Sequence, residues 1–371
     1  MTTFNDAVTE LCRRSHAISD IHAHEGAALE YRDELGEMQQ FPACRVSPEE
    51  LARVLGGERG VPELRALVEE RGGDVDLTAF VGDCRFRANL YFHGGARALG
   101  ISLRRLHESV PSFRSLRLPD TLVEWCDRRT GLLLVTGPSG SGKTSTLAAI
   151  VNHINETRRG HVVLIEDPIE YLHRRKQSLI TQREVGGDAR SFASSLHAAV
   201  RQNPDVIVVG EIRDRETMET ALFASETGHL VLATLHSTSA SRAPERVIDF
   251  FAEDLRSLAR AQLGATLIGV IAQVLVPRAD RKGKILACEC LSNTKEASAH
   301  IRDGRFQALD NVMSQSGSAT NMWALNTYLS TLVYAGEIHA EAAVAAAYNR
   351  LDMQERLGAA DGTGTVIALG R

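Results

Sequence analysis

The chain has 371 residues, which is enough for two or three domains with buried cores. Apolar residues make up 43% and charged residues 24%, values that are ordinary for globular proteins and exclude a wholly disordered chain. With 42 basic and 47 acidic residues the net charge is −5, so composition gives no broad basic surface of the kind that binds nucleic acid.

The N-terminal sequence and the cysteines indicate a cytoplasmic protein. MTTFNDAVTELCRRSH lacks the apolar stretch of a signal peptide, and the six cysteines are therefore expected to be reduced thiols. Cys288 and Cys290 lie on one face of a predicted strand, and no second ligand pair completes a zinc site, so no structural zinc is expected. Residues 261–277 lack charge but contain two Gln and a Thr, which argues against a membrane helix.

Residues 1–110 are predicted to form a small α+β domain. Short helical patterns alternate there with predicted strands at 76–81, 86–92 and 99–103. The pair His22 and His24 has a known metal-ligand spacing, but without partner ligands it indicates alternating positions on a strand. Two prolines at 111 and 119 break the periodicity, so residues 111–120 are predicted to be a linker.

Residues 121–276 have the pattern of an α/β domain. Apolar runs at 132–136, 161–165, 205–209 and 230–235 are each followed by a helical stretch. Continuous rather than alternating apolar runs indicate strands buried on both faces, as in a parallel sheet covered by helices. Residues 277–358 are predicted to be mainly helical and residues 359–371 to be a flexible tail.

The strongest chemical signal is a phosphate-binding loop between the strand 132–136 and a helical stretch. Glycines allow such a loop to direct backbone N–H groups at phosphate oxygens, and the following helix N-terminus adds positive potential. The lysine is expected to reach the β- and γ-phosphates of ATP, and the threonine after it to bind Mg²⁺. The loop and its flanking residue are Gly137, Pro138, Ser139, Gly140, Ser141, Gly142, Lys143, Thr144 and Ser145.

Polar groups follow the other predicted strands at the edge where ligands bind in parallel sheets. Glu166 follows the second strand, Glu211 the third and His236 the fourth. Because Asp205 stands at the beginning of its strand, Glu211 is the predicted Mg²⁺-side acid and Glu166 the predicted group that orients the attacking water. The two roles could also be exchanged. His236 is the predicted γ-phosphate sensor.

One histidine and three arginines remain as candidate nucleotide contacts. His229 is seven positions from His236, so the two face opposite sides of a strand at opposite ends, and His229 is equally well explained as a structural or interface residue. Arg85, Arg87 and Arg104 lie on predicted strands of the first domain. They are either solvated or reach a nucleotide that another subunit holds.

Three segments carry a resemblance to a known family. They are LIEDPIEYLH (164–173), SLITQREVGGDARSFASSLHAAVRQNPDVIVVGEIRD (178–214) and ETGHLVLATLHSTSASRAPERVIDFF (226–251). With the phosphate loop, they resemble the PilT-like ATPases of the type II/type IV secretion and type IV pilus superfamily. The similarity is nearly continuous from residue 131 to 273 and looser in SDIHAHEG, CRFRANLYFHGG and GISLRRL of the first domain.

The resemblance implies a PAS-like N-terminal domain followed by a RecA-like ATPase domain that uses ATP and Mg²⁺. It implies an acidic box at 166–170, a Walker B element ending at Glu211 and a histidine box at 227–236, with Arg85, Arg87 and Arg104 near ATP. It also implies a homohexamer that docks from the cytoplasm on an inner-membrane platform protein, in some systems beside a sister ATPase.

Two departures bear on the branch of this superfamily. The four-cysteine metal-binding insert of the extension and type II secretion ATPases is missing, which favours pilus retraction and twitching motility. The retraction branch often carries AIRNLIRE, and the corresponding residues 296–303 are EASAHIRD, which leaves a secretion or pilus-assembly ATPase as the alternative.

Three functions outside this superfamily explain less of the sequence. A RecA-like nucleic-acid motor would need a basic surface with aromatic side chains, whereas aromatic residues make up only 5% of the chain. A small-molecule kinase would leave the acidic box, the histidine box and the first domain unexplained. A subunit that binds nucleotide without hydrolysing it is disfavoured, because every expected catalytic position is filled.

Overall fold

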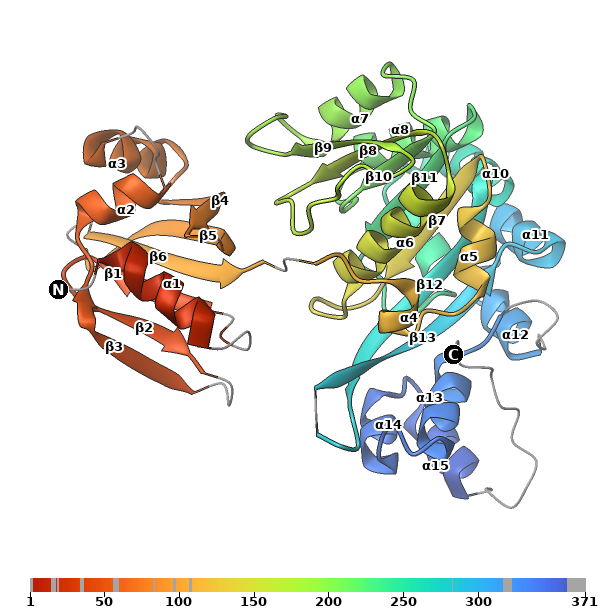
Figure 1. Cartoon of the computed structure of the whole chain (residues 1–371). Helices are drawn as coiled ribbons and strands as arrows, with labels where there is room; N and C mark the ends of the chain where they lie inside the picture. The colour runs from red at the N-terminus through yellow and green to blue at the C-terminus, as the bar shows by residue number, and fades with distance from the viewer. Residues whose placement is uncertain are drawn as a thin grey trace. The chain divides into compact units, whose positions relative to one another are not determined.

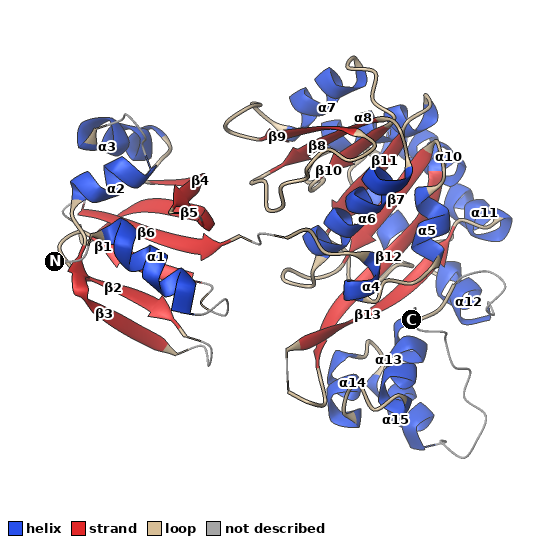
Figure 2. Ribbon diagram, viewed as in Figure 1, coloured by secondary structure: helices blue, strands red, loops and turns tan. Residues whose placement is uncertain are grey.

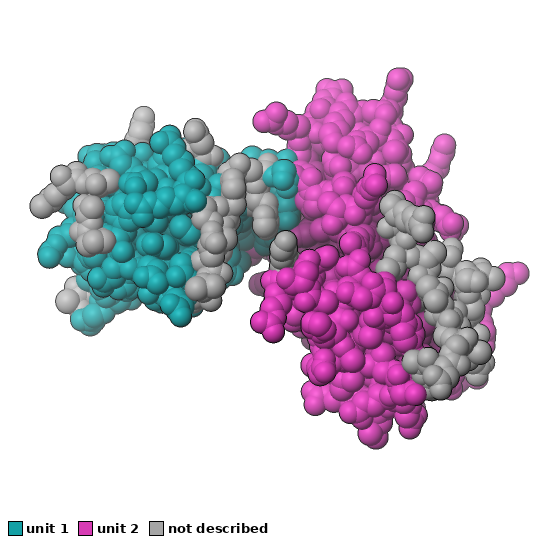
Figure 3. Space-filling view, turned by 60° about the horizontal axis from the view of Figure 1, so that its bottom comes forward, with its two compact units in different colours: residues 1–109, 168–172 teal, residues 110–167, 173–371 magenta. Residues whose placement is uncertain are grey.

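The computed structural model describes residues 3–14, 18, 20–33, 37–55, 60–82, 84–95, 98–106, 109–281, 283–315 and 322–358. The chain forms two compact units, which Figure 3 colours separately. Unit 1 comprises residues 1–109 together with 168–172, and unit 2 comprises residues 110–167 and 173–371. The predicted flexible tail at 359–371 lies outside the described residues.

Unit 1 is an α+β unit built on an antiparallel sheet of order β3-β2-β1-β6-β5-β4 (Figure 1). Its strands are β1 (Asp20–His24), β2 (Ala28–Arg32), β3 (Met38–Arg45), β4 (Asp74–Val81), β5 (Cys84–His93) and β6 (Ala98–Arg105), and its helices are α1 (Phe4–Arg14), α2 (Pro48–Leu55) and α3 (Val61–Glu70). The three predicted strands correspond to β4, β5 and β6.

Amphipathic patterns explain the core of unit 1. On α1, Phe4, Ala7, Val8 and Leu11 recur at helical spacing and are all fully buried. On β1, Ile21 and Ala23 are buried while His22 and His24 alternate with them, as predicted for a strand. The ring of His24 lies 4.4 Å from that of His93 and within 3.1 Å of the Tyr91 hydroxyl, so His24 belongs to an aromatic cluster on β1 and β5.

Unit 2 contains a seven-stranded sheet of order β13-β12-β7-β11-β10-β8-β9. The strands are β7 (Gly131–Thr136), β8 (His161–Glu166), β9 (Leu179–Glu184), β10 (Val206–Val209), β11 (Leu230–Leu235), β12 (Leu267–Pro277) and β13 (Lys284–Ser292). Neighbouring strands are parallel except β13, which pairs antiparallel with β12. The predicted mainly parallel sheet is therefore confirmed.

Helices pack on both faces of this sheet (Figure 2). Along β7, Leu133 and Val135 enter one core and Leu132 and Leu134 enter the other, so the continuous apolar run supplies both faces. The first core includes α4 (Phe113–Leu116), α5 (Thr121–Cys126), α6 (Lys143–Thr157), α13 (Leu325–Tyr334), α14 (Ala340–Ala346) and α15 (Arg350–Gly358). The second includes α7 (Phe192–Val200), α8 (Arg215–Glu226), α9 (Ala243–Ile248), α10 (Arg256–Thr266), α11 (Lys295–Asp303) and α12 (Ala308–Gln315), with a 3₁₀ turn at Glu253–Leu255.

The predicted linker at 111–120 instead belongs to unit 2. Ser112 and Ser115 form a capping box that begins the short helix α4, and Leu118 is 3% exposed in the first core. The ring of Phe113 lies 5.0 Å from that of His153 on α6. The prolines restrict their neighbours, but the cap and these apolar contacts give the segment a fixed place.

The predicted boundary at residue 276 falls inside a hairpin. β12 ends at Pro277, and β13 continues the same sheet, so the sheet extends to Ser292 before the helices α11–α15 begin. Cys288 and Cys290 point into the same core from β13, and all six cysteines are buried thiols outside any disulfide. Among the described residues there is no group of three or more His, Cys, Asp or Glu side chains that could hold a metal ion.

No helix within the described ranges is both long enough and apolar enough to cross a membrane.

A close approach at Gly269 on β12 gives a stability prediction. A Cβ atom there would lie 2.5 Å from Cη2 of the buried Trp125 and 2.9 Å from the carbonyl oxygen of Leu291. We expect Gly269→Ala to lower the free energy of unfolding by about 1–3 kcal/mol, because the ring and the neighbouring strand must both move. Gly187→Ala is the control, since no atom lies within 4 Å of the added methyl and its effect is expected within about 0.5 kcal/mol. Urea titration of the two variants measures the difference, and equal stabilities would contradict the packing argument.

Candidate nucleotide site

The phosphate loop at 137–142 connects β7 to α6 in unit 2 (Figure 1). Gly137 has φ 143°, and a Cβ atom there would lie 2.3 Å from the carbonyl oxygen of Gln273 on β12. Gly140 and Gly142 also have positive φ, 74° and 88°. These three positions explain why the loop needs glycines, and α6 begins directly after them at Lys143.

Lys143 folds back over this loop. Its Nζ donates to the carbonyl oxygens of Gly137 at 2.9 Å and Pro138 at 3.1 Å. Burial lowers the pKa of Lys143, and the carboxylate of Glu211 acts in the opposite direction. The ammonium group is therefore held at the mouth of the loop, within the electrostatic influence of an acid from another strand end.

Glu211 follows β10, and each of its carboxylate oxygens has a basic side chain as partner. One carboxylate oxygen is 2.6 Å from Nη2 of Arg213 and the other is 2.7 Å from Nε2 of His236. Burial acts to raise the pKa of Glu211, but the hydrogen bond and charge of Arg213, with the charges of His236 and Lys143, outweigh it and lower the pKa. Glu211 is therefore an ionised carboxylate near neutral pH.

Glu166 ends β8, the strand next to β10. Its Oε1 accepts a hydrogen bond from Nε2 of Gln182 on β9 at 2.9 Å, and the residue is 9% exposed. The N–H of Gly210 donates to the carbonyl oxygen of Ile165 at 2.8 Å, which fixes the segment leading to Glu211 beside the end of β8. Glu166 and Glu211 thus leave the sheet from adjacent strand ends.

His236 follows β11, the strand between β7 and β10. The next residue, Ser237, is bound to the end of β7: its N–H donates to Oγ1 of Thr136 at 2.8 Å, and that hydroxyl donates to its carbonyl oxygen at 2.9 Å. The loop after His236 is therefore anchored one residue before the phosphate loop begins. Four neighbouring strands, β7, β11, β10 and β8, therefore end on the same side of the sheet. The side chains that lie at these carboxyl-terminal ends are Lys143, His236, Glu211 and Glu166.

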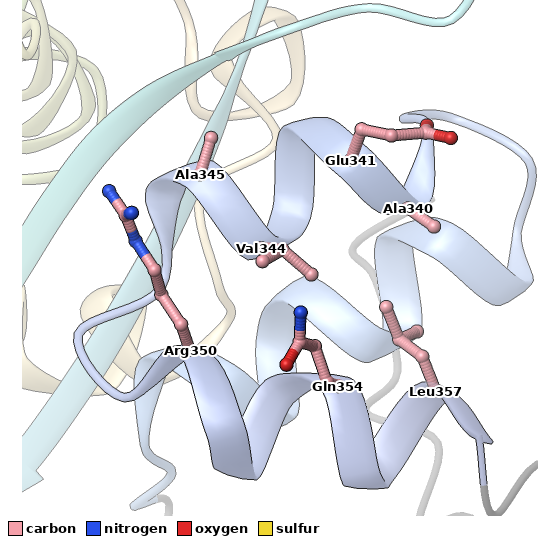
Figure 4. A pocket seen from close by; sticks show the side chains of 7 residues that line it. All are labelled: Ala340, Glu341, Val344, Ala345, Arg350, Gln354 and Leu357. Atoms are coloured by element: carbon pink, nitrogen blue, oxygen red, sulfur yellow. The ribbon is translucent and has the colours of Figure 1, made fainter.

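A cleft of about 350 Å³ opens beside the phosphate loop and is lined by Gly137, Pro138, His236, Ser237, Thr238, Arg242, Glu245, Arg246 and Asp249. A larger hollow of about 480 Å³ lies between α14 and α15 (Figure 4). It is lined by Ala340, Glu341, Val344, Ala345, Arg350, Gln354 and Leu357, with Arg350 at one end and Glu341 at the other. Neither a glycine loop nor a lysine lines that hollow. The cleft at Gly137 is therefore the better nucleotide site despite its smaller volume.

His229 lies at the N-terminal end of β11, whereas the phosphate loop follows the C-terminal end of the neighbouring strand β7. It precedes Leu230, which pairs with Gly131 at the start of β7, whereas the loop follows Thr136 at the other end. Its Nδ1 is 3.0 Å from the carbonyl oxygen of Ala224 at the end of α8. Within its own chain His229 therefore lies the length of the six-residue strand β11 away from the phosphate loop, and its predicted contact with nucleotide stays a prediction.

The three candidate arginines belong to unit 1. Arg87 on β5 and Arg104 on β6 are directly opposite each other and pair with Asp76 at 3.1 Å and Asp20 at 2.8 Å. Arg85 is 9% exposed, and its Nη2 donates to the carbonyl oxygens of Ile169 and Glu170 in the segment 168–172 of the same unit. The predicted role of these arginines at a neighbouring subunit stays a prediction.

Sequence reasoning missed four residues that hold this site. They are Arg213, which pairs with Glu211; Gln182, which binds Glu166; Thr136, which anchors Ser237; and Gln273, whose Nε2 donates to the carbonyl oxygen of Ser141 at 2.7 Å. A signal existed for Gln273, because a glutamine inside an otherwise apolar run is unusual for a strand core. The other three depend on which strands are neighbours.

These residues fit a magnesium nucleotide. Gly137 lets the loop lie directly against the backbone of β12, where a Cβ atom would meet the carbonyl oxygen of Gln273. Lys143 folds back over the loop, and the ionised Glu211 acts on the pKa of Lys143. Thr144, in the first turn of α6, and Glu211 are the side chains that would hold Mg²⁺.

Comparison with known proteins agrees with this geometry. The family described as type II/IV secretion system protein matches residues 112–351. The twitching motility protein of Neisseria gonorrhoeae is 36% identical over 86% of this chain and 84% of its own length. The type IV pilus ATPase PilU of Pseudomonas aeruginosa is 37% identical over 86% of this chain and 82% of its own length.

A solved structure extends the similarity to the fold. The crystal structure of the pilus retraction motor PilT with bound ADP superposes with a TM-score of 0.84 at 36% identity, over 96% of this chain and 100% of that chain. The similarity therefore extends over unit 1 as well as over the sheet of unit 2.

Proposed function

This chain belongs to the family of type II/IV secretion system proteins, and on that premise we propose that it hydrolyses ATP to power the retraction of type IV pili. One observation carries the chemistry: Lys143, His236, Glu211 and Glu166 leave neighbouring strands at the edge of the sheet where the phosphate loop lies. The relatives' names and the ADP in the PilT crystal support the function.

The residues of this chain suffice for hydrolysis of a phosphoanhydride. Backbone N–H groups of the loop 137–142 and the ammonium of Lys143 would bind the β- and γ-phosphates. Thr144 and Glu211 would hold Mg²⁺, which offsets negative charge on the phosphate oxygens when it is bound. Glu166 would orient the attacking water, and His236, which Glu211 fixes at 2.7 Å, would contact the γ-phosphate.

The chain is further proposed to work as a homohexamer with a PAS-like first domain and a RecA-like second domain. In such a ring Arg85, Arg87 and Arg104 would approach the nucleotide of a neighbouring subunit and offset the charge that develops on the transferred phosphate. The ring would act from the cytoplasm on an inner-membrane platform protein, with or without a sister ATPase. The platform would convert domain motion into retraction of the pilus.

A pilus-assembly or secretion ATPase is the second candidate. It is favoured by α11, where the described residues 296–303 read EASAHIRD in place of the AIRNLIRE that is frequent in the retraction branch. A nucleic-acid motor has no comparable observation in its favour, and single-stranded DNA is not expected to stimulate hydrolysis.

Deletion of the gene, with complementation by wild type or by Lys143→Ala, tests the function. We expect the deletion and the Lys143→Ala strain to carry excess surface pili and to lose twitching motility, because pili are assembled but not withdrawn. Lys176→Ala is the matched control, since Lys176 forms a surface ion pair with Glu156 at 2.6 Å and is expected to complement fully. Absence of pili, or unchanged pili with a secretion defect, would overturn retraction in favour of the second candidate.

A further inference from the structure

Glu289 is a buried acid in unit 2 that the hydrolysis chemistry does not use. It lies on β13, is 4% exposed, and has a backbone hydrogen bond at each carboxylate oxygen. Oε1 accepts from the N–H of Ala240 at 2.6 Å, and Oε2 accepts from the N–H of Leu325 at 3.2 Å. Glu289 therefore joins two segments that are far apart in the sequence.

The Ala240 side leads back to the nucleotide site. Ala240 is in the loop that begins after His236 and that Ser237 anchors to Thr136, one residue before the phosphate loop. Within this loop the hydroxyl of Ser237 donates to the carbonyl oxygen of Ser239 at 3.0 Å, so the turn before Ala240 is hydrogen-bonded. Glu289 thus holds the far end of the same loop whose near end lies beside the γ-phosphate sensor.

The Leu325 side leads to the C-terminal helices. Leu325 is the first residue of α13, and the residue before it, Ala324, provides no side-chain cap. The carboxylate of Glu289 takes the place of that cap from another element, and its negative charge lies at the positive end of the helix dipole. Trp323 is paired with Cys290 by two backbone bonds, of 3.1 and 3.2 Å, which fixes the approach to α13 next to Glu289.

A carboxylate in this position is costly, which argues that its two bonds matter. Burial, with a smaller contribution from the charge of Asp310 on α12, raises the pKa of Glu289 to about 7 against the opposing effect of the two backbone N–H groups. The charge of Glu289 also contributes to raising the pKa of Cys290 and of Tyr348. An apolar side chain would fill this place in β13 without such a cost, but it would leave both N–H groups without an acceptor.

We propose that Glu289 is a positioning residue that couples the loop behind His236 to the first turn of α13. Binding of nucleotide at the phosphate loop then makes the helices α13–α15 more rigid, and the carboxylate of Glu289 transmits this effect. The inference rests on the proposed function, because it requires nucleotide at Lys143. The loop after His236 is hydrogen-bonded to Glu289 through the N–H of Ala240. Glu289 is in turn hydrogen-bonded to α13 through the N–H of Leu325.

Glu289→Gln is the variant that separates the two bonds. An amide has one acceptor oxygen and a donor NH₂ group, so it can satisfy one backbone N–H and must oppose the other. We expect kcat to fall about ten-fold while the nucleotide Kd stays within about two-fold, because Lys143 and the loop 137–142 are untouched. Cys288→Ala is the control: it is buried on the same strand and removes packing from the core that contains Leu325, but it leaves both hydrogen bonds to Glu289 in place.

The protonation of Glu289 gives a second readout. Between the ordinary value of 4.5 and about 7 the folded state binds one proton more than the unfolded state, so this residue makes stability fall as pH rises through that window. We expect the Tm of the wild type to fall more steeply from pH 5 to pH 8 than the Tm of Glu289→Gln. Identical pH profiles would contradict a buried carboxyl at this place.

Hydrogen exchange on the full-length protein tests the coupling directly. Peptides covering 322–334 are followed with and without a non-hydrolysable ATP analogue, after its binding has been measured with a fluorescent nucleotide. We expect the analogue to increase protection of α13 in the wild type and in Cys288→Ala, and to leave it unchanged in Glu289→Gln. An α13 that does not respond in the wild type, or responds equally in Glu289→Gln, would overturn the proposal. Failure of the wild type to bind the analogue at all would instead overturn the proposed function. The comparison of wild type with and without the analogue tests the coupling even where a variant does not fold.

Discussion

Lys143→Ala is expected to reduce ATP hydrolysis by about 100-fold or more and to weaken nucleotide binding as well. Nζ of Lys143 lies over the loop at 2.9 Å from the carbonyl oxygen of Gly137 and 3.1 Å from that of Pro138. When phosphate enters, this ammonium is the nearest fixed cation that the loop itself provides. Loss of one such preorganised charge costs about 10²–10³ in rate in comparable sites.

Phosphate release and binding of a fluorescent ADP analogue measure the two effects separately. Lys176→Ala is again the matched control, because it removes an exposed lysine of the same unit that binds Glu156 and Asn152 instead of the phosphate loop. A Lys143→Ala protein that hydrolyses ATP at more than a tenth of the wild-type rate would refute the assignment of this loop.

Glu211→Gln is expected to lower kcat by about 100-fold or more while the Kd for nucleotide changes only a few-fold. The amide keeps the shape of the side chain but loses the charge that pairs with Arg213 at 2.6 Å and with His236 at 2.7 Å. His236 then loses its contact with a charged carboxylate. In the proposed role of Glu211 at Mg²⁺, the variant also loses an acid that holds the metal, so a higher Mg²⁺ concentration should be needed for half-maximal hydrolysis.

The comparison with Glu166→Gln separates the two possible roles of these acids. If Glu211 holds the metal, only Glu211→Gln changes the Mg²⁺ dependence, and Glu166→Gln lowers kcat at unchanged Mg²⁺ requirement. The reverse pattern would exchange the roles. Glu216→Gln serves as control, since Glu216 is an exposed acid on α8 only 3.7 Å from His197 and outside the site. Wild-type activity in Glu211→Gln would remove this residue from the mechanism.

The sequence predicts the centre of unit 2 well because several local signals agree there. Strands β7, β8, β10 and β11 are continuous apolar runs, and the run 230–235 coincides with β11 to the residue. The glycine loop and the start of α6 follow from a single motif. Strand ends are also sequence features, so Glu166, Glu211 and His236 could be placed at one edge before the strand order was known.

Other elements were missed for physical reasons. β9 is an edge strand whose residues are mostly half-exposed, so it lacks the apolar run by which the central strands were found. β12 begins directly where α10 ends at Thr266, without a turn residue between helix and strand. Arg213 and Thr136 act through residues on neighbouring strands, and no local pattern states which strands are neighbours.

The assignment of residues 168–172 to unit 1 also could not be predicted. The segment follows β8 of unit 2 in the sequence, yet it groups with residues 1–109, where Arg85 donates to two of its carbonyl oxygens. Sequence-based domain limits assume one continuous stretch for each domain. A short excursion of five residues gives no change in composition that would reveal it.

The position of β7 inside the sheet has a consequence for the order in which the protein is made. β7 begins at Gly131, but its two partners, β11 and β12, begin at Leu230 and Leu267, so both edges of the phosphate-loop strand stay unpaired until much of unit 2 has left the ribosome. The support that Gln273 gives to Ser141 arrives last. A nascent chain that ends before β12 contains the complete glycine motif and should still be unable to retain nucleotide.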